Sequence, residues 1–393
     1  MKITMKISYS YAEERLFALL KEQDLDVRRR KAHGLWLDVI THKQQPITID
    51  NRALFLFYGK AQHVTLVGDW SYWQPNTSLQ RIEHTDLFYA IVQFPPDARL
   101  QYKMIVDGNW LNDPANYRVQ AEAFGYNSEF WMPEYQDISM LEVHHAVQHG
   151  SIERVMFEST LLNSHREMFF YTPPKKINGN DKQDALLPNE LPLLVIHDGG
   201  EAIRLGRFNV IMDNLISENK IPRVAAVFIS PQMRNEEYAT NNDYIRFTTE
   251  EALPFILSEF EKRGVKISND RYMRCVTGAS LGGLLSTKTV LKYPDAFGSV
   301  IAQSPSYWWN RGEIFRMNEM HNAHRIHFVI QTGTICDAKD LASLMATRLR
   351  SMAAKVDYFE HSQGHTWGNW RTTFSQGLQA WLPKKHSEHI IEL

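Results

Sequence analysis

The stretch MRCVTGASLGGLLSTKTVLKYP, residues 273–294, decides the fold of this chain. It opens with a short apolar run typical of a buried strand, passes through Gly278-Ala279-Ser280-Leu281-Gly282 and continues into a helical pattern. G-x-S-x-G between a strand and a helix is the nucleophile elbow, a turn tight enough to collide with side chains at Gly278 and Gly282. The turn lifts the serine hydroxyl clear of the sheet, and the next amide faces the position where an oxyanion would form. We therefore predict Ser280 as a nucleophile and Leu281 as an oxyanion donor.

The chain on both sides of this stretch alternates apolar strands with helices. Continuous apolar strands alternating with helices predict a parallel sheet that is covered on both faces. Together with the elbow, this pattern predicts an α/β-hydrolase fold. The expected strands lie at 193–198, 224–230, 273–278, 297–304, 325–333 and 355–361, and the expected helices include 207–220, 243–264, 281–294 and 370–382.

The first part of the chain has a different organisation. Between about residues 50 and 133, short apolar or alternating runs are separated by turn signals, which predicts an immunoglobulin-like β-sandwich. Residues 8–21 have the pattern of an amphipathic helix, and the basic run 28–31 that of an exposed turn. We assign a helical segment to 1–48, the sandwich to 49–140 and the hydrolase domain to 150–393. Two further strands are expected at 153–160 and 167–173, followed by a mobile loop at 174–190.

Composition limits the function classes. The 393 residues carry a formal net charge of -2, which predicts neither nucleic acid nor an anionic membrane as partner. No stretch approaches eighteen apolar residues, and the N-terminal segment lacks the apolar region of a signal peptide. The two cysteines are too few for a disulfide framework. We expect a cytoplasmic protein with no cofactor and no metal; the oligomeric state stays open.

A serine nucleophile needs a base and an acid. In this fold the chain order is serine, then the acid, then the histidine. His365 lies in a glycine-flanked loop after the last expected strand, and His361 is a weaker rival. The acid should follow the preceding strand, where Asp337 and Asp340 both occur. We favour Asp337, which lies closer to the strand end, and expect one of the two to cap the next helix. A second oxyanion donor should come from Gly199 or Gly200.

These residues resemble the esterase D family, and within it the enterochelin (ferric-siderophore) esterases, over almost the whole chain. The similar segments are the elbow at 278–283, the R-x-x-E-L-like 234–238, the E-L-L-P-like 251–254, the S-x-S-x-W-W-like 304–309 and the G-G-H-D-W-like 363–367 with Trp370-Arg371. The resemblance implies hydrolysis of a siderophore-like or other acylated small molecule through an acyl-enzyme, and a role in iron transport. Candidate substrate-binding residues are Arg207, Arg234, Trp308 and Trp367. One departure is that Asp337 lies four residues after Gly333, where the family tends to have three.

The sandwich resembles the early-set, glycogen-binding-like module through Val64–Trp70, Trp73 and Val106–Trp110. In glycan-binding relatives the positions matching Trp73, Lys103, Trp110 and Asn127 hold sugar. The alternative, which we favour, is that the tryptophans pack the sandwich or its interface with the hydrolase domain.

Three functions therefore compete. The first is hydrolysis of a siderophore-like ester. The second is a carbohydrate esterase that releases acetyl or feruloyl groups and uses the sandwich to bind glycan. The third is a non-catalytic binding protein, against which the strained elbow argues. The acyl and alcohol parts of the substrate are not determined by these patterns.

Overall fold

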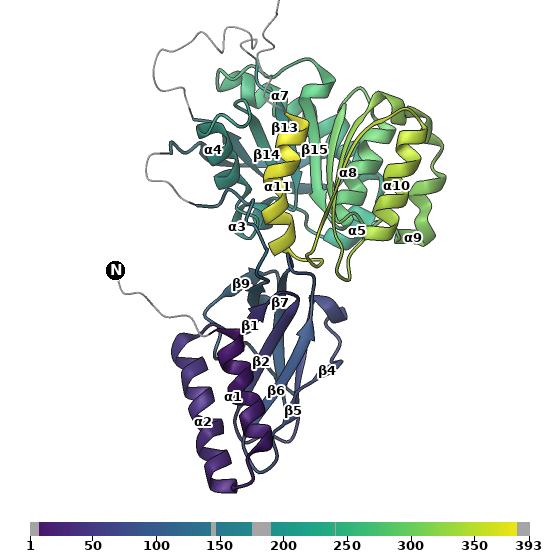
Figure 1. Ribbon diagram of the computed structural model, residues 1–393. Helices are drawn as coiled ribbons and strands as arrows, with labels where there is room; N and C mark the ends of the chain where they lie inside the picture. Colours follow the sequence, from purple (N-terminus) through teal and green to yellow (C-terminus); the bar gives the residue numbers. More distant parts are fainter. Residues whose placement is uncertain (1–7, 143–146, 175–189, 240, 383–393) are drawn as a thin grey trace, which may run out of the picture. The chain divides into compact units, whose positions relative to one another are not determined.

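The computed structural model describes residues 8–142, 147–174, 190–239 and 241–382 (Figure 1). The chain divides into two compact units. One unit consists of residues 1–136 together with two short segments from far along the chain, 333–337 and 361–369. The other contains 137–332, 338–360 and 370–393. Nearly all of the loop expected at 174–190 lies outside the described residues.

The first unit is built around two antiparallel β-sheets that pack face to face, which confirms the predicted sandwich. One sheet has the strand order β1-β2-β6-β5, and the other has the order β4-β3-β7-β10-β9 with β8 paired to β7. Aromatic side chains from both sheets, among them Phe55, Tyr102 and Phe130, form the core between them. The bounds are β1 Ile47–Ile49, β2 Arg52–Tyr58, β3 Val64–Gly68, β4 Thr77–Ser78, β5 Gln80–Arg81, β6 Leu87–Gln93, β7 Arg99–Val106, β8 Asn109–Leu111, β9 Val119–Glu122 and β10 Gly125–Trp131, with a 3₁₀ turn at Asp69–Ser71.

Two helices, α1 (Tyr9–Lys21) and α2 (Leu25–His42), cover the outer face of the first sheet (Figure 1). The expectation of a turn at residues 28–31 is wrong, because these residues lie inside α2. The Asp24 carboxylate accepts from the N–H groups of Asp26 and Val27 and starts the helix, and the face with Leu35 and Val39 is buried. The basic run hides the helix because it has no apolar residue of its own: the buried positions of α2 begin after it, at Ala32.

The second unit contains one eight-stranded sheet in the described residues, in the order β11-β12-β14-β13-β15-β16-β17-β18. Strands β14, β13, β15, β16 and β17 are parallel to one another, while β11 and β12 form an antiparallel hairpin at one edge and β12 pairs antiparallel with β14. This is the predicted α/β-hydrolase sheet. The bounds are β11 Ser151–Ser159, β12 Ser164–Thr172, β13 Leu193–His197, β14 Ala225–Ile229, β15 Arg274–Ala279, β16 Ser299–Gln303, β17 His327–Gly333 and β18 Lys355–His361.

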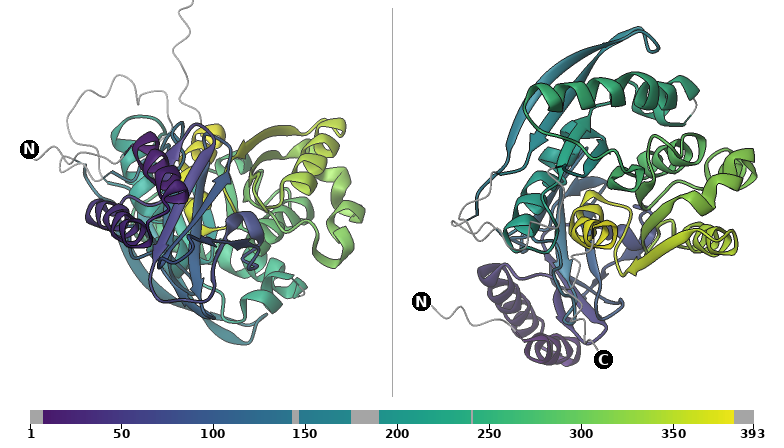
Figure 2. Two further views of the ribbon diagram at one scale, coloured as in Figure 1. Left: turned by 60° about the horizontal axis from the view of Figure 1, so that its bottom comes forward. Right: turned by 90° about the horizontal axis from the view of Figure 1, so that it is seen from above.

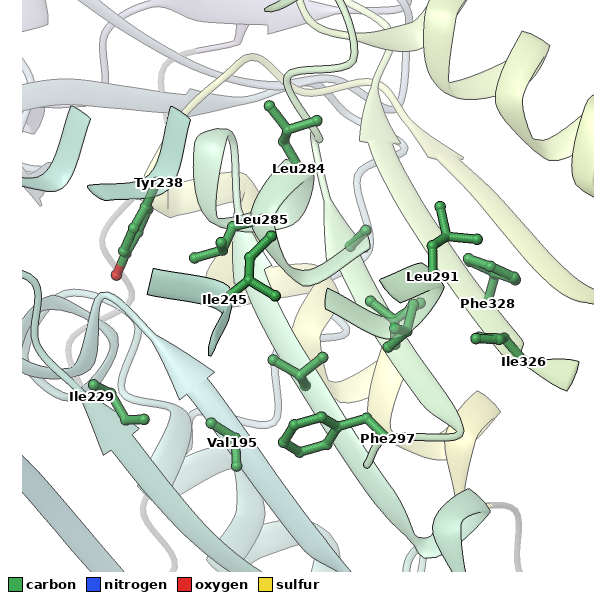
Figure 3. Close-up of a cluster of buried hydrophobic side chains, with 14 of the residues drawn as sticks. Val195, Ile229, Tyr238, Ile245, Leu284, Leu285, Leu291, Phe297, Ile326 and Phe328 are labelled. Carbon is green, nitrogen blue, oxygen red and sulfur yellow. The ribbon is translucent and has the colours of Figure 1, made fainter. Parts of the chain in front are cut away.

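Helices cover both faces of this sheet (Figure 2). On one face α4 and α11 lie together, and the rings of Phe208 and Phe374 stack with their centres 3.7 Å apart. On the other face α7, α8 and α10 pack over a continuous apolar cluster that includes Val195, Leu284 and Phe328 (Figure 3). The bounds are α3 Gly199–Arg204, α4 Phe208–Ser217, α5 Arg234–Ala239, α6 Asn242–Arg246, α7 Leu253–Lys262, α8 Leu281–Lys292, α9 Trp309–Gly312, α10 Lys339–Ser351 and α11 Trp367–Trp381.

Two expected helices differ in detail. The helix expected at 243–264 is α6 and α7 joined by a π-helical turn at Phe247–Ala252. The helix expected at 370–382 begins three residues earlier, at Trp367. Among the described residues, no helix has the length and apolar character needed to cross a bilayer.

Candidate active site

The elbow at the end of β15 has the backbone strain that its motif predicts. Ser280 adopts φ 58° and ψ -120°, a conformation that L-residues with a side chain rarely adopt. Its N–H donates to the Gln303 carbonyl at 2.9 Å, and its carbonyl accepts from Ser306 N–H at 3.0 Å. These backbone hydrogen bonds hold the strained residue, while its Oγ lies 3.2 Å from Ser306 Oγ. The serine hydroxyl thus stands at the N-terminus of α8 on a fixed backbone.

The glycines of the elbow are required for different reasons. A Cβ on Gly278 would lie 2.6 Å from the Gly282 carbonyl carbon, so only glycine fits there. The expected backbone collision at Gly282 is wrong, because the nearest atom to a Cβ there is Asp198 Oδ2 at 3.4 Å, an ordinary contact. Gly283 is tighter, with Gln303 O at 3.2 Å and Pro305 Cβ at 3.1 Å. The turn is therefore closed by Gly278 and Gly283.

The loop after β13 provides the second candidate oxyanion donor. A Cβ on Gly199 would lie 2.7 Å from the Phe228 carbonyl carbon, so this backbone runs directly against β14. Gly200 N–H donates to Ser230 Oγ at 3.2 Å. Since that hydrogen bond already engages Gly200, Gly199 is the stronger of the two candidates, beside Leu281 at the start of α8.

A forked ion pair ties this loop to the elbow. Arg234 Nε and Nη2 donate to the two Asp198 oxygens at 2.7 and 2.8 Å, and Nη2 also lies 3.3 Å from the Ala279 carbonyl. The Asp198 N–H donates to Tyr238 Oη at 2.9 Å. Planar bidentate pairing of this kind fixes geometry as well as charge. Arg234, a candidate substrate-binding residue, is thus engaged by Asp198 and joins the loop after β13 to Ala279, the residue before Ser280. The motif spacing held no signal of this pairing.

His197, directly before Asp198, is not a candidate base. Burial, together with the positive charge of Arg234, lowers the pKa of His197 to about 3. Its ring lies among Tyr238 and Tyr244, with centroid distances of 5.4 and 6.0 Å. The imidazole of His197 is therefore neutral at physiological pH. The charged side chains beside it are Asp198 and Arg234.

The candidate base and acid are hydrogen-bonded to each other. His365 Nδ1 lies 2.6 Å from Asp337 Oδ1, and the Asp337 side chain has 0% exposure against 36% for His365. Asp337 Oδ2 accepts from the Gly333 N–H at 2.6 Å. This hydrogen bond engages Nδ1 and thereby sets the orientation of the imidazole ring. Asn369 Nδ2 adds a longer contact of 3.5 Å to Asp337 Oδ2.

The alternatives for these roles are placed elsewhere. Asp340 is exposed in the first turn of α10. The expectation that one aspartate caps this helix is wrong, because the N-cap is Ala338 and no side chain caps the helix there. Asp337 is turned away toward His365 instead. His361 ends β18, and its carbonyl accepts from Thr334 N–H at 2.8 Å.

Each of the three candidate catalytic residues follows a strand of the large sheet. Ser280 follows β15, Asp337 follows β17, and His365 follows β18. Strands β15, β16 and β17 are parallel neighbours, and β18 is next in the sheet. The carboxyl ends of parallel strands share one edge of a sheet, which is where α/β proteins place their sites.

The residues predicted to contact substrate differ in exposure. Trp308 is 56% exposed and Arg207 is partly exposed at the start of α4. Trp367 is only 4% exposed, and its backbone N–H donates to Glu122 at 3.1 Å. The low exposure of Trp367 leaves little of its ring for contact with a substrate, so its role in binding stays a prediction. No cluster of three or more metal-ligating side chains occurs in the part of the chain that the structure describes.

The four sandwich positions that match glycan-holding residues are in different environments. Trp110 is 52% exposed, so it does not pack into the sandwich core, and its packing against the hydrolase domain stays a prediction. The core tryptophan is Trp70, which packs against Phe55 and Phe94. Trp73 is partly exposed, and Asn127 Nδ2 donates to Gln101 Oε1 at 2.9 Å. Lys103, two residues after Gln101, is partly buried.

The fold and the elbow define the class of this protein as an α/β-hydrolase. Comparison with known families agrees: residues 159–381, more than half of the chain, match the family described as "Putative esterase". The chain belongs to this esterase family. Residues 52–127 match a second family, the glycogen recognition site of AMP-activated protein kinase.

Individual relatives point to two groups of esterases. The Iron(III) enterobactin esterase of Escherichia coli K12 is 27% identical over 213 residues, 50% of this chain and 51% of that protein. An endo-1,4-beta-xylanase/feruloyl esterase of Xylanibacter ruminicola is 25% identical over 216 residues, 50% of this chain and 27% of that protein. The matches thus span about half or less of these relatives. The enterobactin esterase of Shigella flexneri has the same fold, with a TM-score of 0.67 and 19% identity over 84% of this chain and 92% of that one.

Proposed function

We propose that this chain is a serine ester hydrolase in which Ser280 is the nucleophile, His365 the general base and Asp337 the residue that orients His365. The observation that carries the proposal is the strained elbow at Ser280, because a fold retains such backbone strain where chemistry uses it. The hydrogen bond between Asp337 and His365 supports it.

The proposed reaction follows from these positions. His365 Nε2 takes the proton of the Ser280 hydroxyl as Oγ attacks the ester carbonyl carbon, and Asp337 stabilises the imidazolium. The N–H groups of Leu281 and Gly199 donate to the oxyanion. The imidazolium then protonates the departing alcohol, which leaves an acyl-enzyme. His365 then deprotonates a water molecule as it attacks the acyl carbon, and the imidazolium returns this proton to Ser280 Oγ as the acid is released.

The proposed substrate is a siderophore-like ester or another acylated small molecule. The match to an Iron(III) enterobactin esterase supports this class. The exposed indole of Trp308 offers a flat apolar face for an aromatic acyl group, and Arg207 a positive charge for an anionic one.

A substrate panel tests this proposal. We expect purified protein to hydrolyse p-nitrophenyl butyrate, and a ferric tris-catecholate triester with a kcat/KM at least about tenfold above that for methyl ferulate, a difference of about 1.4 kcal/mol. Product release is followed by absorbance and by chromatography. Hydrolysis of methyl ferulate in clear preference to the triester would overturn the substrate class, and failure with every ester would overturn the enzyme itself.

A second candidate function is a carbohydrate esterase, favoured by the glycogen-recognition match and by the feruloyl esterase relative. The exposed Trp110 could stack on a sugar ring. Against it, Asn127 is already engaged by Gln101.

Retention on a polysaccharide gel separates the two functions. We expect wild-type protein to migrate through glycogen or xylan gels without retardation, and Trp110→Ala to behave identically. Bovine serum albumin serves as the unretained reference. Retardation of the wild type that Trp110→Ala removes would instead establish a glycan-binding module and favour the carbohydrate esterase.

A further inference from the structure

The sandwich unit holds the loop that carries the candidate base. Segment 361–369 and segment 333–337 belong to this unit, although they follow strands of the large sheet. The Arg99 N–H donates to the Ser362 carbonyl at 3.1 Å, and Ile335 packs against the sandwich core. The environment of His365 is therefore set by the sandwich as well as by the strands that precede it.

Glu122, the last residue of β9, makes the most direct polar contact with this loop. Its Oε2 accepts from the Trp367 N–H at 3.1 Å, and its Oε1 from the Gly368 N–H at 3.3 Å. These are the first residues of α11, where N–H groups have no partner within the helix. A carboxylate at this position satisfies both donors and interacts favourably with the helix dipole. It fixes the helix start two residues after His365.

Glu122 is itself held by residues of the same sheet face. Gln101 Nε2 donates to Glu122 Oε1 at 2.7 Å, and Asn127 Nδ2 donates to Gln101 Oε1 at 2.9 Å. Asn127 is one of the positions that match sugar-holding residues. In this chain the Asn127 amide on β10 begins a series of hydrogen bonds that continues through Gln101 on β7 to Glu122 and the start of α11.

A second carboxyl, Asp69, lies under the other end of the loop. A Cβ on Gly364 would lie 2.5 Å from Asp69 Cβ and Cγ, so the loop passes directly over this side chain and needs glycine next to His365. Asp69 Oδ2 accepts from the Gln101 N–H at 2.8 Å. Burial raises the pKa of Glu122, and that of Asp69 to about 7. Placing two carboxyls here therefore costs desolvation, which their hydrogen bonds partly offset.

We propose that Glu122 is a positioning residue for His365, and that the sandwich face resembling a glycan-binding surface supports the histidine loop in this chain. The proposal rests on the proposed role of His365 as general base. Glu122 acts through the start of α11, and Gln101 and Asn127 hold Glu122 in place.

Kinetics with a small ester test the proposal. Glu122→Ala is expected to lower kcat for p-nitrophenyl butyrate by about 10- to 100-fold, as a displacement near 1 Å of a catalytic group does, with KM within about twofold of wild type. Glu122→Gln keeps one acceptor oxygen, so its kcat should lie between those of wild type and Glu122→Ala. Lys103→Ala changes the same face of β7 and is the matched control, with wild-type kinetics expected.

Hydrogen exchange gives a readout that does not depend on activity. Without substrate, the amides of Trp367 and Gly368 should exchange at least about tenfold faster in Glu122→Ala than in wild type, as for loss of about 1.4 kcal/mol of local protection. Asn127→Ala should show a smaller increase in the exchange rates of these two amides. This variant replaces Glu122→Ala in the test if Glu122→Ala does not fold. Unchanged exchange in both variants, or unchanged kcat in a folded Glu122→Ala, would overturn the positioning role. If these amides exchange faster in Glu122→Ala but the wild-type protein hydrolyses no ester, Glu122 still supports the loop. Only the proposed function would then be overturned.

Discussion

Replacing Ser280 with alanine is expected to abolish ester hydrolysis and leave the fold unchanged. Loss of the nucleophile of a serine–histidine–aspartate triad typically lowers kcat by about 10⁶-fold. Alanine removes only one oxygen, and the backbone at this position meets the same steric restriction with either side chain. The backbone hydrogen bonds of residue 280 to Gln303 and Ser306 do not involve the side chain and should persist.

The measurement is the initial rate with p-nitrophenyl butyrate, together with circular dichroism and thermal unfolding. Ser351→Ala, at the exposed end of α10, is the control and should behave as wild type. A fluorophosphonate probe should label wild type and Ser351→Ala but not Ser280→Ala. Activity retained by Ser280→Ala would refute the serine mechanism as a whole.

Asp337→Asn is expected to lower kcat by about 10³- to 10⁴-fold, because an amide favours the wrong tautomer of the imidazole it contacts. The buried carboxylate uses both oxygens: Oδ1 lies 2.6 Å from His365 Nδ1, and Oδ2 accepts from the Gly333 N–H. An asparagine can satisfy only one of these two partners through its single oxygen. The side chain keeps its size, so the variant should fold.

Asp340→Asn is the matched control, three residues further along and exposed. Its kcat should stay within about twofold of wild type, as for most surface substitutions. Should Asp340→Asn be the damaging change, the acid has been assigned to the wrong residue. Normal rates in both variants would point to a mechanism with serine and histidine alone.

The parts of the site that could be predicted from sequence are those with a local signature. Ser280 stands in a glycine-flanked turn between a strand and a helix, and each of these features lies within a few residues. The parallel strands could also be predicted from the sequence, because they are buried on both faces and are therefore continuously apolar. The two domain types followed from the change of hydrophobic period along the chain.

The parts that could not be predicted depend on distant partners. The pairing of Arg234 with Asp198 joins residues 36 positions apart, and that of Glu122 with Trp367 joins residues 245 apart. No periodicity in either segment encodes such a contact. The helical conformation of Arg28 to Lys31 was not predicted for a related reason: these four residues carry no apolar position, and the buried residues that define α2 begin only at Ala32. The domain boundaries drawn along the chain stay a prediction.

The positive φ of Ser280 means that folding and chemistry make opposite demands on this position. A left-handed backbone suits glycine, which adopts it without the Cβ clash that any other side chain brings. A selection of random variants for heat resistance alone would therefore favour Ser280→Gly. Because this variant lacks the proposed nucleophile, we expect it to hydrolyse no ester. The proposed role of Ser280 as nucleophile requires a serine there, against the preference of the backbone. A thermostability campaign on this enzyme would have to hold position 280 constant and seek its gains elsewhere.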